Sequence, residues 1–376
     1  VTDEDDEGPA GGMSSKQLEY LRTKALKKFD VIQDWFEKMR LAFESEGYRS
    51  TGYIEAKENI AMHLRDYAAM SKALIFFDGN SSFRTSIMRS LDDDSVVMGW
   101  GDVQGSEEPF IADGSRNGVF TIPADWGRNL SVLSGIKVSG SLRQNTHDQP
   151  KTEEKVHYVC FYVSDGDNLQ WTINRGNDSD WWGSDSRGNY KLGWTIPPSI
   201  CELAPSVAKW YYDTAASGKD NFIVGPSGGG FIFPELYPSK ELDLHTQRLN
   251  DYMEKTDTRV VGVIGKDSFN NTKVWDHYTE QSQIDGIFYY DWLSFFGNPY
   301  SREIHWSNGK PVIATAYKLA DGLSYAQNKN TVLRGLNWAS RNPHSAKGYS
   351  LVAVDAWNNY DLPKTIQYIV DRLDSD

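Results

Sequence analysis

Continuous apolar runs alternate with segments of helical periodicity over most of this chain. Runs that are apolar throughout, rather than at every second position, are typical of parallel strands covered on both faces. Nine such runs lie at 73–77, 96–100, 118–122, 156–163, 221–224, 260–264, 286–290, 312–316 and 349–354. Helical spacing is found at 205–216, 242–255, 274–282, 332–339 and 363–373. The alternation predicts an α/β fold, a TIM-like barrel with irregular segments. Because such a barrel has eight strands, we expect one of the nine runs to lie outside it or not to be a strand.

The first part of the chain has a different pattern. Residues 1–15 are acidic and glycine-rich, which predicts a disordered tail or linker. From Ser15 to about Glu46, apolar residues recur at three- and four-residue steps, and a second helix is expected at 54–70. We therefore divide the chain into a tail (1–15), an N-terminal helical segment packed on the barrel (16–70) and the barrel domain (71–376).

Charge and composition narrow the classes of function. The chain has 39 Lys and Arg against 52 Asp and Glu, a net charge of −13, and no basic cluster, which argues against nucleic-acid binding. It contains no apolar run of the ~20 residues needed to span a bilayer. Its 13 tryptophans and 20 tyrosines suit either a large core or surfaces that stack on sugars.

The localisation that we expect is secretory or extracellular. The chain begins with Val1 rather than Met, as a processed product does. Asparagines that begin Asn-x-Ser/Thr glycosylation sequons agree with this expectation, and they are Asn80, Asn129, Asn177 and Asn270.

The segment 225–234 is the richest in candidate chemistry. It contains four glycines, followed by Phe231, Phe233 and a proline. Glycines let the backbone turn sharply or approach a ligand closely, and the two phenylalanines point the same way in an extended chain. This pattern predicts the floor and wall of a site for a flat, hydroxyl-rich ligand. The segment also matches the Gly-x-Ser-x-Gly elbow of serine hydrolases around Ser227, but its glycines and prolines disfavour the helix that an elbow requires.

Three motifs in this order resemble those of the GxGYxYP family of putative glycoside hydrolases. Residues 228–234 resemble the signature itself, with Phe231 and Phe233 in place of both tyrosines. Residues 164–171 resemble a second hallmark, and residues 181–194, with the pair Trp181-Trp182 and the later Trp194, resemble a third. The resemblance extends over about residues 70–376 and implies the barrel fold and glycoside hydrolysis. The two phenylalanines remove any substrate contact that the phenolic hydroxyls make in relatives.

Carboxylates follow several of the expected strands, at the end where barrels carry their function. Asp165 and Asp167 flank Gly166 directly after the run 156–163, Asp291 precedes Trp292, and Asp355 comes shortly before Trp357. Sugar cleavage needs one acid to protonate the leaving oxygen and a second to act as base or nucleophile. An aspartate after a strand also commonly caps the next helix.

Our leading hypothesis is a glycosidase that acts on a poly- or oligosaccharide. Asp165 or Asp167 is the expected first catalytic carboxylate and Asp291 the expected second. Residues expected to bind the substrate are Asn168, Trp171, Trp182, Ser227, Gly228, Gly229, Gly230, Phe231, Trp292, Asp355 and Trp357.

Three alternatives remain open. Asp165 and Asp167 could instead hold Ca²⁺, because this ion prefers oxygen ligands; the seven scattered histidines do not suit zinc. The chain could be a glycan-binding or extracellular structural protein without turnover. It could also be an esterase that uses Ser227, with the proton acceptor one of His245, His277, His305 and His344.

Overall fold

A computed structural model describes most of the chain beyond residue 63. It covers residues 64–76, 81–99, 107–124, 126–144, 153–292, 300–323, 326–357, 359 and 361–374, and seven residues between 16 and 27. Each of those seven is helical, and so are residues 64–71, in agreement with the expected N-terminal helices. The predicted tail lies outside the described residues.

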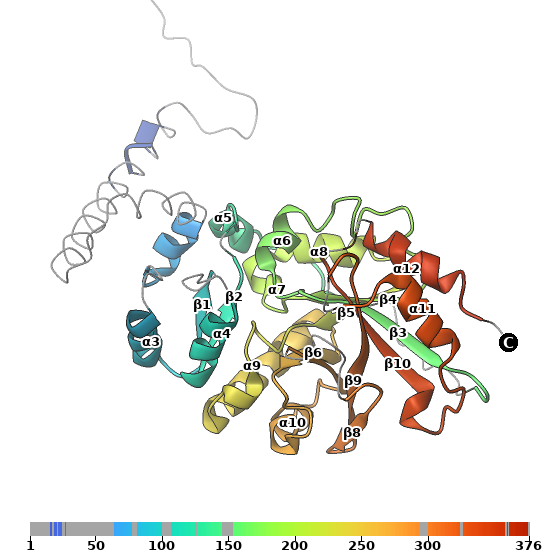
Figure 1. The fold of residues 1–376 in the computed structure, drawn as a ribbon. Coiled ribbons are helices and arrows are strands. Elements are labelled where there is room, and N and C mark those ends of the chain that lie inside the picture. The colour runs from blue at the N-terminus through green and yellow to red at the C-terminus, as the bar shows by residue number, and fades with distance from the viewer. Residues whose placement is uncertain are drawn as a thin grey trace, which may run out of the picture.

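Seven parallel strands close into a barrel (Figure 1). They are β3 (Tyr158–Val163), β4 (Leu192–Ile196), β5 (Asp220–Val224), β6 (Val260–Gly265), β7 (Gly286–Asp291), β9 (Lys310–Leu319) and β10 (Tyr349–Val354). The sheet closes because β10 pairs with both β9 and β3. A short strand, β8 (Ile304–Ser307), pairs antiparallel with β9. The predicted TIM-like α/β barrel is confirmed, with seven parallel strands instead of eight.

Helices surround the barrel, and five of those that the structure describes correspond to the five expected segments. They are α6 (Leu169–Asn174), α7 (Ile200–Leu203), α8 (Pro205–Thr214), α9 (Ser239–Thr256), α10 (Thr272–Thr279), α11 (Lys329–Asn337) and α12 (Leu362–Val370), with the short helices η1 (Pro234–Leu236) and η2 (Ala346–Gly348). Side-chain caps fix two of their starts: Asn328 accepts from the Thr331 amide at 3.0 Å, and Asp361 accepts from the Lys364 amide at 3.2 Å.

The barrel has two apolar layers. Tyr162, Ile223, Leu351 and Ala353 form a cluster to which β3, β5 and β10 contribute, and the partly buried residues packed on it also come from strands. A larger cluster joins strand residues with residues of the surrounding helices. Burial on both faces explains why these strands read as continuous apolar runs.

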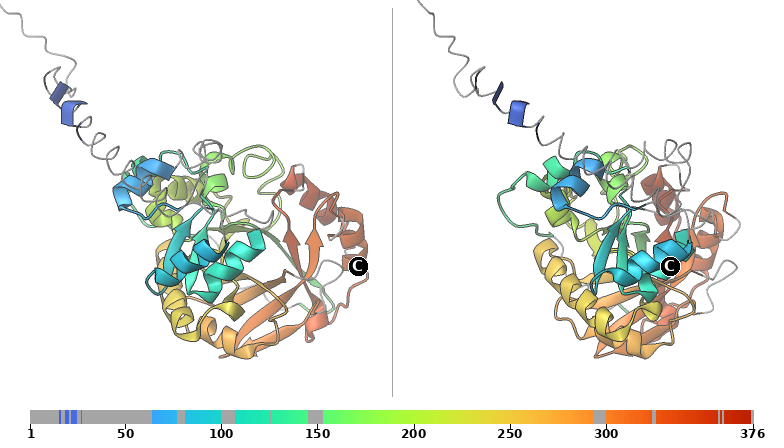
Figure 2. Two further views of the ribbon diagram at one scale, coloured as in Figure 1. Left: turned by 60° about the vertical axis from the view of Figure 1, so that its left-hand side comes forward. Right: turned by 90° about the vertical axis from the view of Figure 1, so that its left-hand side faces the viewer.

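A small module, which we define as residues 81–135, stands beside the barrel. It contains α3 (Ser81–Ser90), β1 (Ser95–Met98), α4 (Glu107–Arg116), β2 (Val119–Ile122) and α5 (Leu130–Gly135). Strands β1 and β2 form their own parallel two-stranded sheet. Figures 1 and 2 show this module packed against the barrel and separate from its sheet.

An apolar cluster joins the small module to the barrel. Met88, Phe110, Ile111 and Val119 of the module pack with Phe231, Phe233 and Ile264 of the barrel. The last three residues follow β5 or belong to the end of β6, so the module lies at the carboxyl end of those strands.

Three details of the predicted strand set are wrong. The runs 96–100 and 118–122 correspond to β1 and β2, which lie outside the barrel. Residues 73–76 are irregular, and Phe77 lies outside the described residues. Strand β4, which the apolar pattern did not reveal, takes a place in the barrel between β3 and β5. Among the described residues, the structure has no helix with the length and hydropathy of a membrane span.

Candidate active site

The turn after β3 brings Asp165 to the end of the barrel in a special backbone conformation. Asp165 has φ 62°, in the left-handed region. The next residue, Gly166, lies so close to β4 that a Cβ there would be 2.2 Å from the carbonyl carbon of Thr195. Only glycine fits this approach, which explains why a glycine separates the two aspartates. The backbone geometry thus directs Asp165 and Asp167 to different surroundings.

Asp165 is partly buried and its carboxyl group has a strongly raised pKa. Burial, followed by the negative charge of Asp355, raises the pKa of Asp165 from 3.8 to about 7. Glu107 adds a smaller contribution in the same direction, against hydrogen bonds from the Ser164 hydroxyl and the Ala356 amide. A carboxyl group with a pKa in this range is suited to donate a proton near neutral pH.

Asp167 lies deeper than Asp165 and is 3% exposed. Burial, together with the charges of Asp165 and Glu107, raises the pKa of Asp167 well above its usual value. Its carboxyl group is bonded by its own amide and by that of Asn168. Asn168 is also buried, and its side-chain oxygen accepts from Gln170 Nε2 at 3.3 Å. Asp167 and Asn168 therefore form the buried base of the turn, beneath Asp165.

Asp355, at the end of the neighbouring strand β10, provides the second carboxylate beside Asp165. Its Oδ1 accepts a hydrogen bond from the Trp357 amide at 2.9 Å, and its own amide donates to the Leu319 carbonyl at 2.9 Å. The side chain of Asp355 remains partly exposed. Asp165 and Asp355 are thus partly accessible carboxylates on adjacent strands, and one raises the pKa of the other.

A tryptophan cluster borders Asp355. Trp357 is 47% exposed. Its ring makes edge-to-face contacts with those of Trp171 and Trp181, at centroid distances of 5.8 Å and 6.4 Å. Trp181 anchors the cluster because its Nε1 donates to the Ala356 carbonyl at 2.6 Å. Trp171 is largely buried, and its Nε1 is without a hydrogen-bond partner among the described residues. Trp357 therefore offers an aromatic surface to solvent immediately beside the acids.

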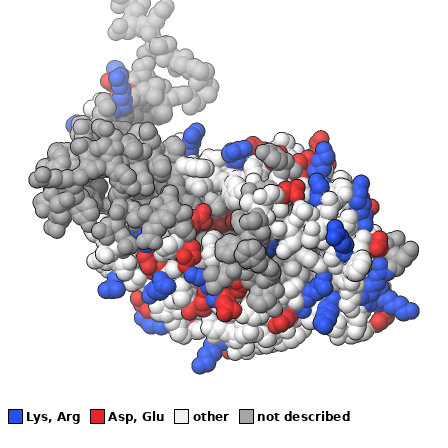
Figure 3. Space-filling model, viewed as in Figure 1, with Lys and Arg blue, Asp and Glu red and all other residues white. Residues whose placement is uncertain are grey.

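The small module adds Glu107, which the sequence analysis did not identify. Glu107 is exposed and begins α4. The neighbouring Glu108 forms an ion pair with Lys266, directly after β6, and this contact fixes the start of α4 at the end of the barrel. Two acids at a helix start are common because they suit the helix dipole, so the sequence carries no signal that distinguishes Glu107. Carboxylates also gather near the middle of the face shown in Figure 3, where the surface is hollowed.

Asp291, the expected second catalytic acid, lies in a different environment. It ends β7, which β9 and β10 separate from β3 on one side of the barrel. It is 1% exposed, and its Oδ2 accepts from the Tyr289 hydroxyl at 2.8 Å and from the Asp267 amide at 2.9 Å. Asp291 is not among the principal charges that act on Asp165 or Asp167. The structure brings Asp165 together with Asp355 and Glu107 rather than with Asp291.

Two further ionisable residues, the buried Lys318 and the half-buried Glu235, have shifted pKa values. Lys318 of β9 donates to the Asp291 carbonyl at 2.6 Å and lies 4.0 Å above the ring of Tyr290. Burial lowers the pKa of Lys318 to about 8, against the opposing charge of Asp291. Glu235, directly after the glycine motif, accepts from the Lys266 amide at 2.9 Å, and burial raises its pKa. Neither residue was singled out in the sequence.

The glycine motif is buried throughout and joins the barrel to the small module. Residues 225–234 are all buried. Phe231 exchanges backbone hydrogen bonds with Thr121 of β2, and a Cβ on Gly228 would be 2.2 Å from His245 Nε2. Gly229 has only ordinary contacts with Phe120 and His245. These contacts give Gly228, Gly229, Gly230 and Phe231 a packing role, so we leave them out of the proposed site.

Ser227 is fully buried and bonded to β6. Its Oγ accepts from the Ile264 amide at 3.2 Å and lies 3.4 Å from the Ile264 carbonyl. Among the described residues, the candidate proton acceptors bond elsewhere: His245 to Asp94, His277 to Asp243, His305 to Asn270 and His344 to Glu154. The serine-hydrolase arrangement is therefore not assembled here.

Two other expected stacking residues pack against side chains of the protein itself. Trp182 is 3% exposed, with the ring of Phe222 stacked at 5.6 Å and the guanidinium of Arg187 at 4.3 Å from its ring centre. Trp292 packs against Phe231 and Phe233 at the boundary with the small module. Both residues therefore have packing roles in the structure.

The remaining predictions concern a Ca²⁺ site and the glycosylation sequons. Among the described residues, no group of three or more His, Cys, Asp or Glu side chains is arranged to hold a metal ion. Three sequon asparagines are exposed, namely Asn129, Asn177 and Asn270, whereas Asn80 lies outside the described residues.

Comparisons with known proteins agree with this architecture. Residues 155–376 match the model of the GxGYxYP putative glycoside hydrolase C-terminal domain, and residues 49–135 match that of the GxGYxYP third domain. The structure is similar to the crystal structure of a putative hydrolase from Bacteroides thetaiotaomicron VPI-5482, with 35% sequence identity and a TM-score of 0.75. The similarity covers 84% of this chain and 61% of that one. No curated protein matches the sequence.

Proposed function

The chain belongs to the GxGYxYP family, and on that premise we propose that it hydrolyses glycosidic bonds of an oligo- or polysaccharide. The observation that carries the proposal is the pair formed by Asp165 and Asp355. Asp165 has a pKa of about 7, and the charge of Asp355 on the adjacent strand helps to raise it. Two carboxylates in unequal environments are the arrangement that glycoside hydrolysis requires.

The proposed chemistry assigns one role to each carboxylate. Protonated Asp165 donates its proton to the leaving glycosidic oxygen as the bond to the anomeric carbon breaks. Ionised Asp355 then acts on the other face of the sugar, either by activating a water molecule or by attacking the anomeric carbon directly. Trp357 stacks on the sugar ring beside them. Asp167 and Asn168 hold the Asp165 turn from below.

The decisive experiment replaces each acid with its amide. Asp165→Asn and Asp355→Asn are each expected to lower kcat by a factor of ~10²–10⁴ on a glycan substrate, with glycan binding retained. Asp291→Asn serves as the comparison, because Asp291 lies outside the coupled pair, and it should affect folding more than turnover. NMR of the first anomer formed then shows whether Asp355 acts as nucleophile or as base.

The same variants test the alternatives for Asp165 and Asp167. If these residues bind Ca²⁺, a chelator lowers the melting temperature of the parent protein and has no effect on the Asp165→Asn variant. If Asp165 only supports the turn, the substitution costs ~1 kcal/mol of stability and activity persists. Full activity in Asp165→Asn contradicts the proposed mechanism.

The second candidate function is glycan binding without turnover. The exposed face of Trp357 favours it, because an aromatic platform serves binding as well as catalysis. A parent protein that binds glycans through Trp357 and releases no reducing ends, at any pH between 4 and 9, would establish this function instead.

A further inference from the structure

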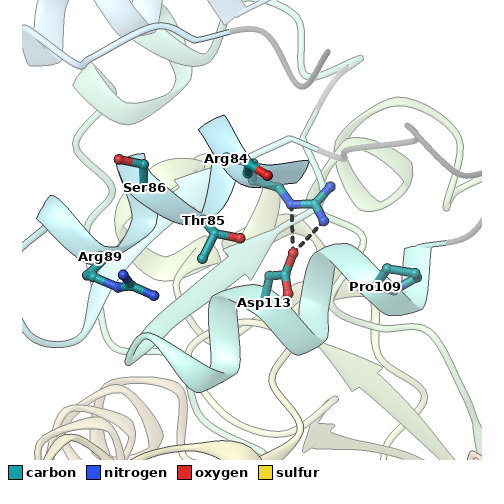
Figure 4. Close-up of a pocket in the computed structure, with 7 residues that line it drawn as sticks. Arg84, Thr85, Ser86, Arg89, Pro109 and Asp113 are labelled. Atoms are coloured by element: carbon teal, nitrogen blue, oxygen red, sulfur yellow. Dashed lines mark hydrogen bonds and ion pairs between the residues drawn. The ribbon is translucent and has the colours of Figure 1, made fainter. Parts of the chain in front are cut away.

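Helices α3 and α4 of the small module border an open polar groove of about 540 Å³ (Figure 4). Its volume falls within the range of ~300–1,000 Å³ that is typical of small-molecule sites. The residues that line it are Ser82, Arg84, Thr85, Ser86, Arg89, Pro109 and Asp113. None of them belongs to the site at the barrel end.

One face of α3 supplies most of the groove. Thr85, Ser86 and Arg89 follow Ser82 by three, four and seven residues. This spacing places all four on one side of the helix. Opposite them, α4 contributes Pro109 and Asp113, one turn apart. The groove therefore combines three hydroxyl groups with charged groups. Hydroxyls in this number suit a ligand that itself carries hydroxyls.

The charges of the groove are unbalanced toward positive. Arg84 is 2% exposed and bonds Asp113 through Nε at 3.1 Å and through a second guanidinium nitrogen. Arg116 adds a longer ion pair to Asp113 at 3.5 Å. Arg89 is exposed and, in the part of the chain that the structure describes, forms no ion pair. Two arginines thus neutralise Asp113, and Arg89 adds a further positive charge to the groove, on a chain whose net charge is −13.

One wall of the groove is formed by α4, the helix that begins at the proposed catalytic end of the barrel. Asp113 follows Glu107 by six residues on α4, which is ~9 Å along the helix axis at 1.5 Å per residue. Glu107 is one of the charges that act on Asp165. A saccharide of several residues is long enough to contact both places.

We propose that this groove is an auxiliary subsite for a sugar that carries a carboxylate or sulfate group, with Arg89 as its anchor. The inference rests on the proposed function, and it makes acidic glycans the substrate class. The planar fork of an arginine side chain matches the oxygens of either anionic group. Ser82, Thr85 and Ser86 lie on the same side of α3 as Arg89 and make this wall of the groove polar.

Calorimetric binding to three polysaccharides tests the proposal. Polygalacturonate supplies carboxylates, dextran sulfate supplies sulfates, and dextran is neutral. The titrations use protein that carries Asp165→Asn, so that hydrolysis cannot consume the ligand. We expect Arg89→Ala to weaken binding of at least one anionic polysaccharide by about tenfold. Arg89→Lys should recover part of that loss because it keeps the charge and loses the fork.

The matched control is Arg128→Ala, at an exposed arginine of the same module that does not line the groove. It should leave binding unchanged, and added salt should weaken binding of the anionic polysaccharides more than that of dextran. Equal affinity of Arg89→Ala and the parent for all three polysaccharides would overturn the proposal, and so would an equal loss in Arg128→Ala. Turnover is measured separately in proteins with an intact Asp165. Binding that depends on Arg89 without any hydrolysis would contradict the proposed function alone, and hydrolysis with binding that does not depend on Arg89 would contradict the subsite alone.

Discussion

Gly230 lies directly against Thr121, so that a Cβ on Gly230 would be 2.4 Å from the Thr121 carbonyl oxygen. The next residue, Phe231, donates to that oxygen at 2.7 Å and accepts from the Thr121 amide at 3.1 Å. A stretch after β5 and a strand of the small module are thus joined backbone to backbone. The most distinctive motif of the sequence holds two parts of the fold together.

Replacement of Gly230 by Ala should destabilise the protein by ~1–3 kcal/mol, because the new methyl group forces the two backbones apart. Gly229→Ala is the matched control, since a Cβ there has its nearest neighbour, on Phe120, at 3.6 Å. Urea unfolding of both variants measures the difference. Equal loss of stability in the two variants would show that the close approach at Gly230 is not important.

The sequence predicted the fold class correctly because burial on both faces leaves a clear apolar signature. It could not assign β1 and β2 to their own sheet, because their runs are apolar in the same way and only spatial pairing distinguishes them. Strand β4 escaped notice because Gly193 interrupts a run of five residues, and glycine normally weakens a strand. In the structure the Tyr162 side chain on β3 packs closely against this glycine, because a Cβ on Gly193 would be 3.2 Å from it.

The candidate site was predictable only in part, for a related reason. Strand-end aspartates can be read from a sequence, so Asp165, Asp167 and Asp355 were among the predicted site residues. Which of them face each other depends on strand order, and β10 lies next to β3 only because the barrel closes. Asp291 also lies at the end of a strand, but it is buried and its Oδ2 accepts two hydrogen bonds. Glu107 comes from the small module, whose position the sequence does not give.

The raised pKa of Asp165 predicts a specific dependence of stability on pH. Between about pH 4 and pH 7, folded protein retains a proton on Asp165 that unfolded protein has released. The contribution of this carboxyl to the free energy of unfolding is therefore present at low pH and falls as the pH rises through that window. Asp165→Asn should show a smaller fall than the parent, because it removes this group and leaves Asp167. Urea unfolding at several pH values measures the free energy of unfolding of each protein. The control is Asp185→Asn, at an exposed aspartate. The same dependence of this free energy on pH in the parent and in Asp165→Asn would contradict the raised pKa of Asp165.

Glu107 should tune the pH profile without taking part in bond cleavage. Its negative charge raises the pKa of Asp165, so Glu107→Gln should lower that pKa. If Asp165 is the acid, the alkaline limb of kcat/KM then moves to lower pH. The control is Glu280→Gln, at an exposed residue after α10, whose carboxyl-terminal end lies at the opposite end of the barrel. A profile that does not move in Glu107→Gln would separate Glu107 from the site.

Ser227 should prove structural. Its hydroxyl bonds the backbone of Ile264 and is fully buried, so Ser227→Ala should cost ~1 kcal/mol and retain glycan turnover. A fluorophosphonate probe should leave the parent protein unlabelled at this position. Labelling of Ser227 would restore the esterase alternative, and loss of glycan turnover in a folded Ser227→Ala variant would contradict its structural role.

Trp357 should contribute to glycan affinity through its exposed ring. Trp357→Ala is expected to weaken glycan binding by about tenfold, since truncation removes the aromatic surface beside Asp355. Trp357→Phe should retain part of the affinity because an aromatic face remains.

The matched control is Trp338→Ala: Trp338 is 87% exposed and follows α11, so it lies at the other end of the barrel. Binding is measured by calorimetry on the Asp165→Asn protein, and the melting temperature of each variant shows whether the contacts of Trp357 with Trp171 and Trp181 also support the fold. Similar glycan affinities for the Trp357→Ala and Trp338→Ala variants would show that Trp357 does not contact the glycan. Asp165 and Asp355 would then bind the sugar without this aromatic surface.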